Sequence, residues 1–248
     1  MRITTTQPLF AWGALEDSPS LQTLRELLAA AADAKLLEAL RNWRGHGRDD
    51  YPVTVLWGVI LLTLALRHPS IEACLAELSR NHALAELIGI ESEAGVPKKW
   101  NMSRFLDVLG REPHLTLRHE VFDAMVGILG VGVVALGRDT AGAASGLNAR
   151  GSNPKEKKSQ SALPEPTGGR KEYTDDEGKV VKVVEWFGYK FHLLVDVKHE
   201  VALAYQVTST KVGDHEMLPA LVEEAKANLP PGRIQTPAYD KACEDGKV

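Results

Sequence analysis

The feature that most constrains the fold is a change of hydrophobic periodicity within the chain. Up to about residue 130, apolar residues recur at the spacing of amphipathic helices, whereas from residue 180 onward they alternate with polar ones. Between these regions, the short apolar run 131–138 is bounded by glycines and predicts a buried strand. We therefore expect an α+β protein, with an all-α helical domain at 1–130 followed by a mixed α/β domain at 131–248.

The helical domain contains two basic stretches, 41–48 and 98–104. Their lysine and arginine side chains can contact DNA phosphates, so DNA binding is one interpretation of this domain. A packing or dimerisation domain with solvated charges explains the same residues equally well, because no predicted helix shows a base-reading pattern. The main predicted helices are 18–43, 53–66 and 112–129, with Ser70 as the N-cap of a shorter one.

Composition and charge exclude several classes of protein. The formal net charge of -4 over 248 residues does not by itself indicate a nucleic-acid binder. Cys74 and Cys243 lack metal-ligand spacing, which argues against a cysteine-based zinc site or a disulfide framework and fits a reducing compartment. The N-terminus has no signal-peptide pattern, and the apolar run 53–66 is shorter than the roughly 20 residues that a membrane span needs. We expect a cytoplasmic, nucleoid-associated protein with no membrane partner.

The segment 151–179 is rich in Lys, Glu, Ser, Pro and Gly and nearly free of apolar residues. Such a composition cannot bury enough surface to fold alone, so we expect a polar insertion within the second domain. A basic loop of this kind can lie against a DNA backbone, although a solvated linker is the more frequent outcome.

The rest of the chain predicts strands and one helix. Runs 180–187 and 189–197 are strand-like and meet at Gly188, which suggests a bulge or bend. Run 201–208 alternates again and is predicted to form a hairpin with the run before it. A helix is expected at 214–228, with Leu218, Leu221, Val222 and Ala225 on one face, and a final strand at 233–239.

Strand alternation separates the side chains of residues 189–197 into two sets. One face carries Tyr189, Phe191, Leu193 and Val195, and the other carries Lys190, His192 and Asp196. The polar set is either a charged outer face of the sheet or a surface that approaches a ligand.

Two acids, Asp139 and Asp240, each follow a predicted strand. In a strand–strand–strand–helix–strand arrangement the first and fourth strands are neighbours, so we expect the two carboxylates to lie side by side. Two carboxylates about 4 Å apart repel by roughly 4 kcal/mol at an effective dielectric constant of 20. Divalent cations with a preference for oxygen ligands, such as Mg²⁺, remove that repulsion and promote phosphoryl transfer. An aspartate that caps a turn is the alternative for Asp139.

Several motifs together resemble the bacterial insertion-sequence DDE transposases. The most specific is GYKFHLLVDVKHEVALAYQVT at 188–208, which is similar to the central strands of that family. GRDTA at 137–141 resembles its first-acid motif, and AYDKACED at 238–245 resembles its second. The helical stretch DDYPVTVLWGVILLTLALRHPSIEACLAEL, with LIGI and WNMSRFLDVL after it, resembles the region that precedes the catalytic domain.

The resemblance implies an RNase H-like catalytic domain that cuts and joins DNA with Mg²⁺ or Mn²⁺. It implies Asp139 and Asp240 as the catalytic, metal-binding acids, terminal inverted repeats and target DNA as partners, and a homodimer in the active assembly. An alternative alignment leaves Thr236 at the second-acid position, and we prefer Asp240 because Lys241 and Ala242 then also match. By the same analogy, Arg138, Lys190, His192 and Lys241 are the candidate DNA-binding residues.

The third acid of the family, a glutamate on a later helix, has no counterpart because the sequence stops eight residues after Asp240. We therefore expect a C-terminally truncated copy with an incomplete catalytic domain that is inactive alone. Two other functions remain open: a non-catalytic DNA-binding or dimerising fragment that inhibits full-length transposase, and a metal-dependent nuclease.

Overall fold

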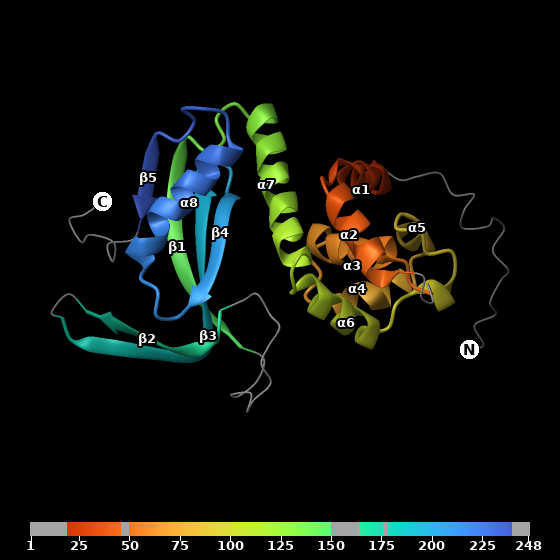
Figure 1. Cartoon of the computed structure of the whole chain (residues 1–248), viewed down its shortest axis with the longest axis horizontal. Coiled ribbons are helices and arrows are strands. Elements are labelled where there is room, and N and C mark those ends of the chain that lie inside the picture. The colour runs from red at the N-terminus through yellow and green to blue at the C-terminus, as the bar shows by residue number, and fades with distance from the viewer. Residues whose placement is uncertain (1–18, 46–49, 150–163, 176–177, 240–248) are drawn as a thin grey trace, which may run out of the picture. The chain divides into compact units, whose positions relative to one another are not determined.

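The computed structural model describes residues 19–45, 50–149, 164–175 and 178–239. The chain divides into two compact units, Met1–Leu109 and Gly110–Val248. The first is helical where it is described, and the second combines helices with a mixed sheet (Figure 1). The expectation of an α+β protein is therefore confirmed.

The first unit is organised around a buried apolar helix, α3 (Val53–Ala65). Ser70 begins the next helix and accepts a hydrogen bond from the backbone N of Ala73, as predicted for an N-cap. The predicted helix 18–43 is instead two helices that are separated at 31–33, where the Asp33 carboxylate accepts a hydrogen bond from Trp57 Nε1 at 2.6 Å. The other elements of this unit are α1 (Pro19–Ala30), α2 (Ala34–Arg44), α4 (Ile71–Leu78), α5 (His82–Glu86), the 3₁₀ helix η2 (Glu93–Gly95) and α6 (Lys99–Leu109).

None of the helices in the described part of the chain is both long enough and apolar enough to cross a membrane. The apolar run at 53–66 forms a helix of 13 residues, α3, whose side chains supply much of the core of the first unit.

The second unit contains a sheet whose main strands lie in the order β4–β3–β1–β5. Strand β3 is antiparallel to both β1 and β4, while β5 returns after helix α8 and pairs in parallel with β1. The bounds are α7 (His114–Gly132), β1 (Asp139–Asn148), β2 (Thr167–Thr174), β3 (Val180–Asp196), β4 (Val201–Ser209), α8 (Asp214–Asn228) and β5 (Thr236–Tyr239). The hairpin of β3 and β4 and the helix at 214–228 are confirmed.

The predicted strand at 131–138 is wrong. Helix α7 continues to Gly132, a turn follows, and Asp139 begins a strand instead of ending one. A short apolar run fits a helix end as well as a strand, and here Leu136 of the turn is only 1% exposed because it packs into the core beneath α8.

Helix α8 covers one face of the sheet (Figure 1). Its Leu218, Leu221 and Ala225 are buried against Leu194 of β3 and Leu203 of β4, as the apolar face predicted from the sequence requires. Helix α7 also contacts α8 and β4, and its Val126 is buried in the same core.

Strand β3 is a single strand of 17 residues that takes part in two structures. Its C-terminal half lies between β1 and β4, whereas its N-terminal half pairs with β2 in a ribbon that extends beyond the sheet (Figure 1). Strand β2 falls within the segment that was predicted to be a polar insertion without secondary structure, and this part of the prediction is wrong. The strand forms because its backbone pairs with β3, which its polar composition did not indicate.

The ribbon meets the sheet at Gly188, where two strands leave no room for a side chain. A Cβ atom at Gly188 would lie 2.0 Å from the carbonyl oxygen of Leu147. Next to it, the Trp186 indole covers Gly146 of β1 and Gly169 of β2, and its Nε1 donates a hydrogen bond to the carbonyl of Tyr189. Glycine at these positions lets the large ring pack directly on the backbone.

Replacing Gly188 with alanine is expected to lower the free energy of unfolding of the second unit by about 2 to 4 kcal/mol, because Leu147 must move to admit the new methyl group. Urea unfolding followed by circular dichroism measures this loss. Gly168→Ala on β2 is the matched control, since a Cβ there meets no heavy atom within 4 Å, and its expected effect is below about 0.5 kcal/mol. Equal losses in the two variants would contradict the explanation.

Candidate functional site

Asp139 lies at the surface where β1 begins, next to β5. Its side chain is exposed, and its backbone carbonyl accepts a hydrogen bond from Val197 N at 2.9 Å. Asp139 is therefore held in position by the sheet while its carboxylate remains open to solvent and to a ligand.

The residue that pairs with Asp139 on β5 is Thr236. Thr236 is the residue that the alternative alignment placed at the second-acid position, and it is exposed. Strand β5 ends at Tyr239, which pairs with Gly142. Asp240 and Lys241 lie outside the described residues.

Arg138 lies beside Asp139 and is exposed. Its Nε donates a hydrogen bond to the side chain of Gln235 at 3.0 Å, and its carbonyl accepts hydrogen bonds from the backbone N of Gln235 and Thr236. These contacts attach β5 to the turn before β1.

A second acid lies close to Asp139 but is buried. Asp196 pairs with Thr140 across β1 and β3 and is only 1% exposed. One carboxylate oxygen accepts a hydrogen bond from Gly137 N at 2.7 Å, and the other accepts from His199 N at 2.7 Å and is 2.6 Å from His199 Nδ1. Burial alone would raise the pKa of Asp196, but these hydrogen bonds outweigh it and lower the pKa below its usual value.

The polar face of β3 lies beneath α8, so the expectation of a charged outer face is wrong for His192 and Asp196. His192 is fully buried, and its Nε2 is 2.9 Å from the hydroxyl of Thr208. Burial lowers the pKa of His192, an effect that Asp214 opposes and Lys190 reinforces. With no part of its side chain exposed, His192 is not available for contact with DNA in this structure.

Lys190 was also a candidate for contact with DNA. Its Nζ is 2.7 Å from the Asp214 carboxylate at the start of α8 and donates a hydrogen bond to the carbonyl of Val212 at 3.0 Å. Only 19% of the lysine side chain is exposed. Both contacts attach the beginning of α8 to the sheet, which gives Lys190 a structural role.

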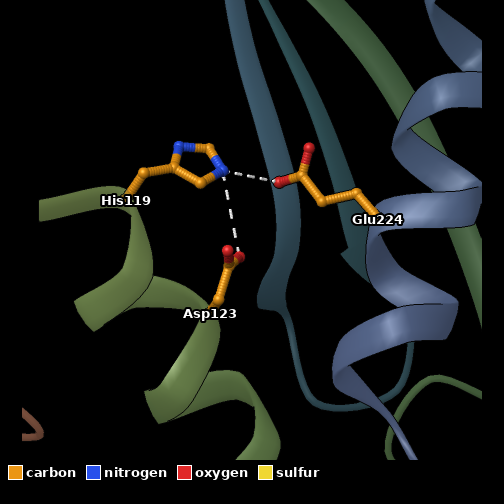
Figure 2. A group of neighbouring side chains, drawn as sticks. All are labelled: His119, Asp123 and Glu224. Carbon is orange, nitrogen blue, oxygen red and sulfur yellow. Dashed lines mark hydrogen bonds and ion pairs between the residues drawn. The ribbon is translucent and has the colours of Figure 1, made fainter. Parts of the chain in front are cut away.

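Helices α7 and α8 bring together a group of metal-ligating side chains that the sequence analysis missed (Figure 2). His119 and Asp123 lie one turn apart on α7 and Glu224 lies on α8, with one potential ligand atom of each within 4.8 Å of the others. His119 Nε2 is 2.9 Å from Glu224 Oε1 and 3.8 Å from Asp123 Oδ1. The spacing of four residues between His119 and Asp123 on a predicted helix was the available signal for this cluster. Glu224 follows more than a hundred positions later, so the sequence did not indicate that it joins them.

The pKa values of this cluster reflect its partial burial. The hydrogen bond to Glu224 is the largest cause that raises the pKa of His119, and Asp123 adds to it. Burial raises the pKa of Asp123. For Glu224, burial acts in the same direction, but hydrogen bonds from His119 and Gln206 outweigh it and the pKa is lowered.

Comparison of the chain with models of protein families, with curated proteins and with solved structures finds no match.

Replacing Asp196 with asparagine is expected to lower the free energy of unfolding by about 2 to 3 kcal/mol near pH 7, because an amide cannot accept all three N–H groups. The lowered pKa also predicts a pH dependence. The carboxylate stabilises the fold fully above its unfolded pKa of about 4, and the contribution is lost as the pH falls through the lower folded pKa.

Urea unfolding at pH 7, 5, 4 and 3 checks both statements. The parent is expected to lose more stability than Asp196→Asn below pH 5, so that the two curves converge in acid. Asp107→Asn, at an exposed position on α6, is the control and is expected to leave the stability at pH 7 unchanged. A constant difference between parent and Asp196→Asn would count against this role of the carboxylate.

Proposed function

We propose that this chain is related to the bacterial insertion-sequence DDE transposases and acts on DNA through metal-dependent phosphoryl transfer. The observation that carries the proposal is the topology of the second unit. Three antiparallel strands in the order β4–β3–β1 are followed by α8 and by β5 parallel to β1. An RNase H-like sheet has this order, and the exposed Asp139 lies where the first and last strands run side by side.

In the proposed reaction, Asp139 and Asp240 would hold Mg²⁺ or Mn²⁺ against the DNA backbone. Such an ion would supply Lewis-acid chemistry for the attack of water, and later of a 3′-hydroxyl group, on phosphorus. Arg138, the residue before Asp139, supports this assignment because its side chain is exposed at the same edge of the sheet, where it can contact a phosphate. Lys241 would add a second positive charge after Asp240.

The first unit supports DNA as the partner through an exposed basic surface on α6. Lys98 precedes this helix, and Arg104 lies within it; both side chains are exposed. Lys99 begins the helix and is also exposed, but its Nζ is paired with the Glu72 carboxylate at 2.5 Å. The Arg104 guanidinium lies 5.0 Å from the ring centre of Trp100, which is itself 53% exposed. A basic surface with an exposed aromatic ring suits a nucleic-acid backbone and its bases.

One observation favours a second candidate, a non-catalytic DNA-binding fragment that competes with a full-length transposase. The partner of Asp139 on β5 is Thr236, which has no carboxylate to share a metal ion. If the second acid of the family corresponds to Thr236, the chain retains the sheet and the DNA-binding surface without a complete metal site.

Calorimetric titration with Mg²⁺ distinguishes these two candidates. The catalytic proposal expects binding by the parent chain, its loss in both Asp139→Ala and Asp240→Ala, and no change in Asp107→Ala, which removes an exposed acid in the other unit. Loss in both variants is expected because two carboxylates share the ion. Absence of binding by the parent would overturn the catalytic proposal and leave the second candidate.

DNA binding is tested with duplex DNA at several salt concentrations. Arg104→Glu is expected to weaken binding about tenfold and to reduce the slope of log K against log salt by about one, because one phosphate contact is lost. Arg80→Glu is the matched control, since it reverses an exposed charge of the same unit that is paired with Glu77. An equal loss in the control would show that only net charge matters.

A further inference from the structure

We propose that His119, Asp123 and Glu224 form a zinc-binding site that joins α7 to α8, separate from the proposed DNA-cleaving acids. The three side chains contribute one imidazole nitrogen and two carboxylate oxygens from two helices of the same unit (Figure 2). The site lies outside the Asp139 region and does not depend on the transposase proposal.

The distances from His119 to the two carboxylates are close to those between neighbouring ligands of a tetrahedral site. Zinc–ligand distances of about 2.0 to 2.1 Å place neighbouring ligand atoms roughly 3.4 Å apart. In the protein, His119 Nε2 lies 2.9 Å from Glu224 Oε1 and 3.8 Å from Asp123 Oδ1, so the two distances bracket that value. Because His119 and Asp123 are one helical turn apart, both side chains point from α7 toward α8 without a change in the backbone.

The donor set selects the class of ion. Two carboxylates balance the charge of a divalent cation, and a neutral imidazole favours zinc and similar transition metals over Mg²⁺, which prefers an oxygen shell. The side chains of His119 and Asp123 are each 28% exposed and that of Glu224 is 18% exposed, so an ion can enter from solvent and a water molecule can complete its coordination.

Surrounding side chains orient the ligands. Asn228 donates a hydrogen bond to Asp123 Oδ1 at 2.7 Å, and Gln206 donates one to Glu224 Oε2 at 2.9 Å. The ring of Tyr205 lies 4.7 Å from the His119 ring, centre to centre, and fixes its plane from the sheet side. Hydrogen-bond donors and packed rings of this kind hold metal ligands in place.

The chain contains a natural control for this proposal. On α5, His82 and Glu86 have the same spacing of four residues, with Nε2 and Oε1 3.4 Å apart. Among the described residues, only the His119 cluster brings three such ligands together. Both units therefore contain a histidine and an acid four residues apart on a helix. The third ligand, Glu224, distinguishes the proposed site.

The test is a competition titration of the full-length chain, freed of metal with a chelator, in which Zn²⁺ is shared with a coloured chelator of known affinity. We expect the parent to bind one zinc ion. The zinc affinity of His119→Ala is expected to be at least about a hundredfold weaker, and that of His82→Ala to be unchanged. Glu224→Gln, which keeps the hydrogen-bonding shape of the side chain, is expected to show the same loss and guards against a folding defect in His119→Ala.

A second readout is thermal stability. Saturating Zn²⁺ is expected to raise the melting temperature of the parent and of His82→Ala by about 5 °C, and to leave that of His119→Ala unchanged. Asp139→Ala must retain the zinc ion, which separates this site from the proposed catalytic one. The proposal is overturned if the parent binds no zinc, if His119→Ala or Glu224→Gln binds it as the parent does, or if Asp139→Ala or His82→Ala loses it.

Discussion

The second unit depends on a buried carboxylate. Asp196 ends β3, and its two oxygens accept hydrogen bonds from the turn before β1 and from the turn that leads to β4. A buried charge is tolerated only when its hydrogen-bonding capacity is used, so the two turns and the strand end must stay together. This constraint determines where β1 begins, and therefore where the exposed Asp139 lies, because Thr140 is the partner of Asp196 across the strands.

Much of the second unit was predictable from local patterns. The period of two in residues 189–208 indicated the hairpin of β3 and β4, and the apolar positions of residues 214–228 indicated α8 and its buried face. The hydrophobic pattern that predicts these elements lies within the residues of each element. Strand β2 has no such pattern, since its residues are polar and its formation rests on pairing with the backbone of β3. The apolar run after residue 130 carries a local signal, but that signal is ambiguous. The end of a helix and the start of a strand can have the same apolar composition, so the run was wrongly predicted to be a strand.

The candidate sites show the same division. The strand order predicted that the first strand of the sheet neighbours the last, and β1 does pair with β5. The prediction that Asp139 closes a strand was wrong, because Asp139 begins β1. The pairing of Asp139 with Thr236, the burial of His192 and the approach of Glu224 to His119 depend on register and on helix packing across long stretches of chain. Alternation assigned Lys190, His192 and Asp196 to one face correctly, but only the position of α8 determines that this face is covered.

The two halves of β3 pair with different strands, and this affects where the chain can accept insertions and deletions. Strands β4 and β2 occupy successive lengths of the same side of β3, with Ser209 opposite Tyr189 and Thr167 opposite Gly188, and Thr210 hydrogen-bonds to Thr167 at the junction. The ribbon beyond Gly188 therefore adds no strand to the core beneath α8. Pairs of residues can be inserted into or deleted from it without shifting the register of β1, β3 and β4. The length of the ribbon can thus change while the core beneath α8 keeps its register.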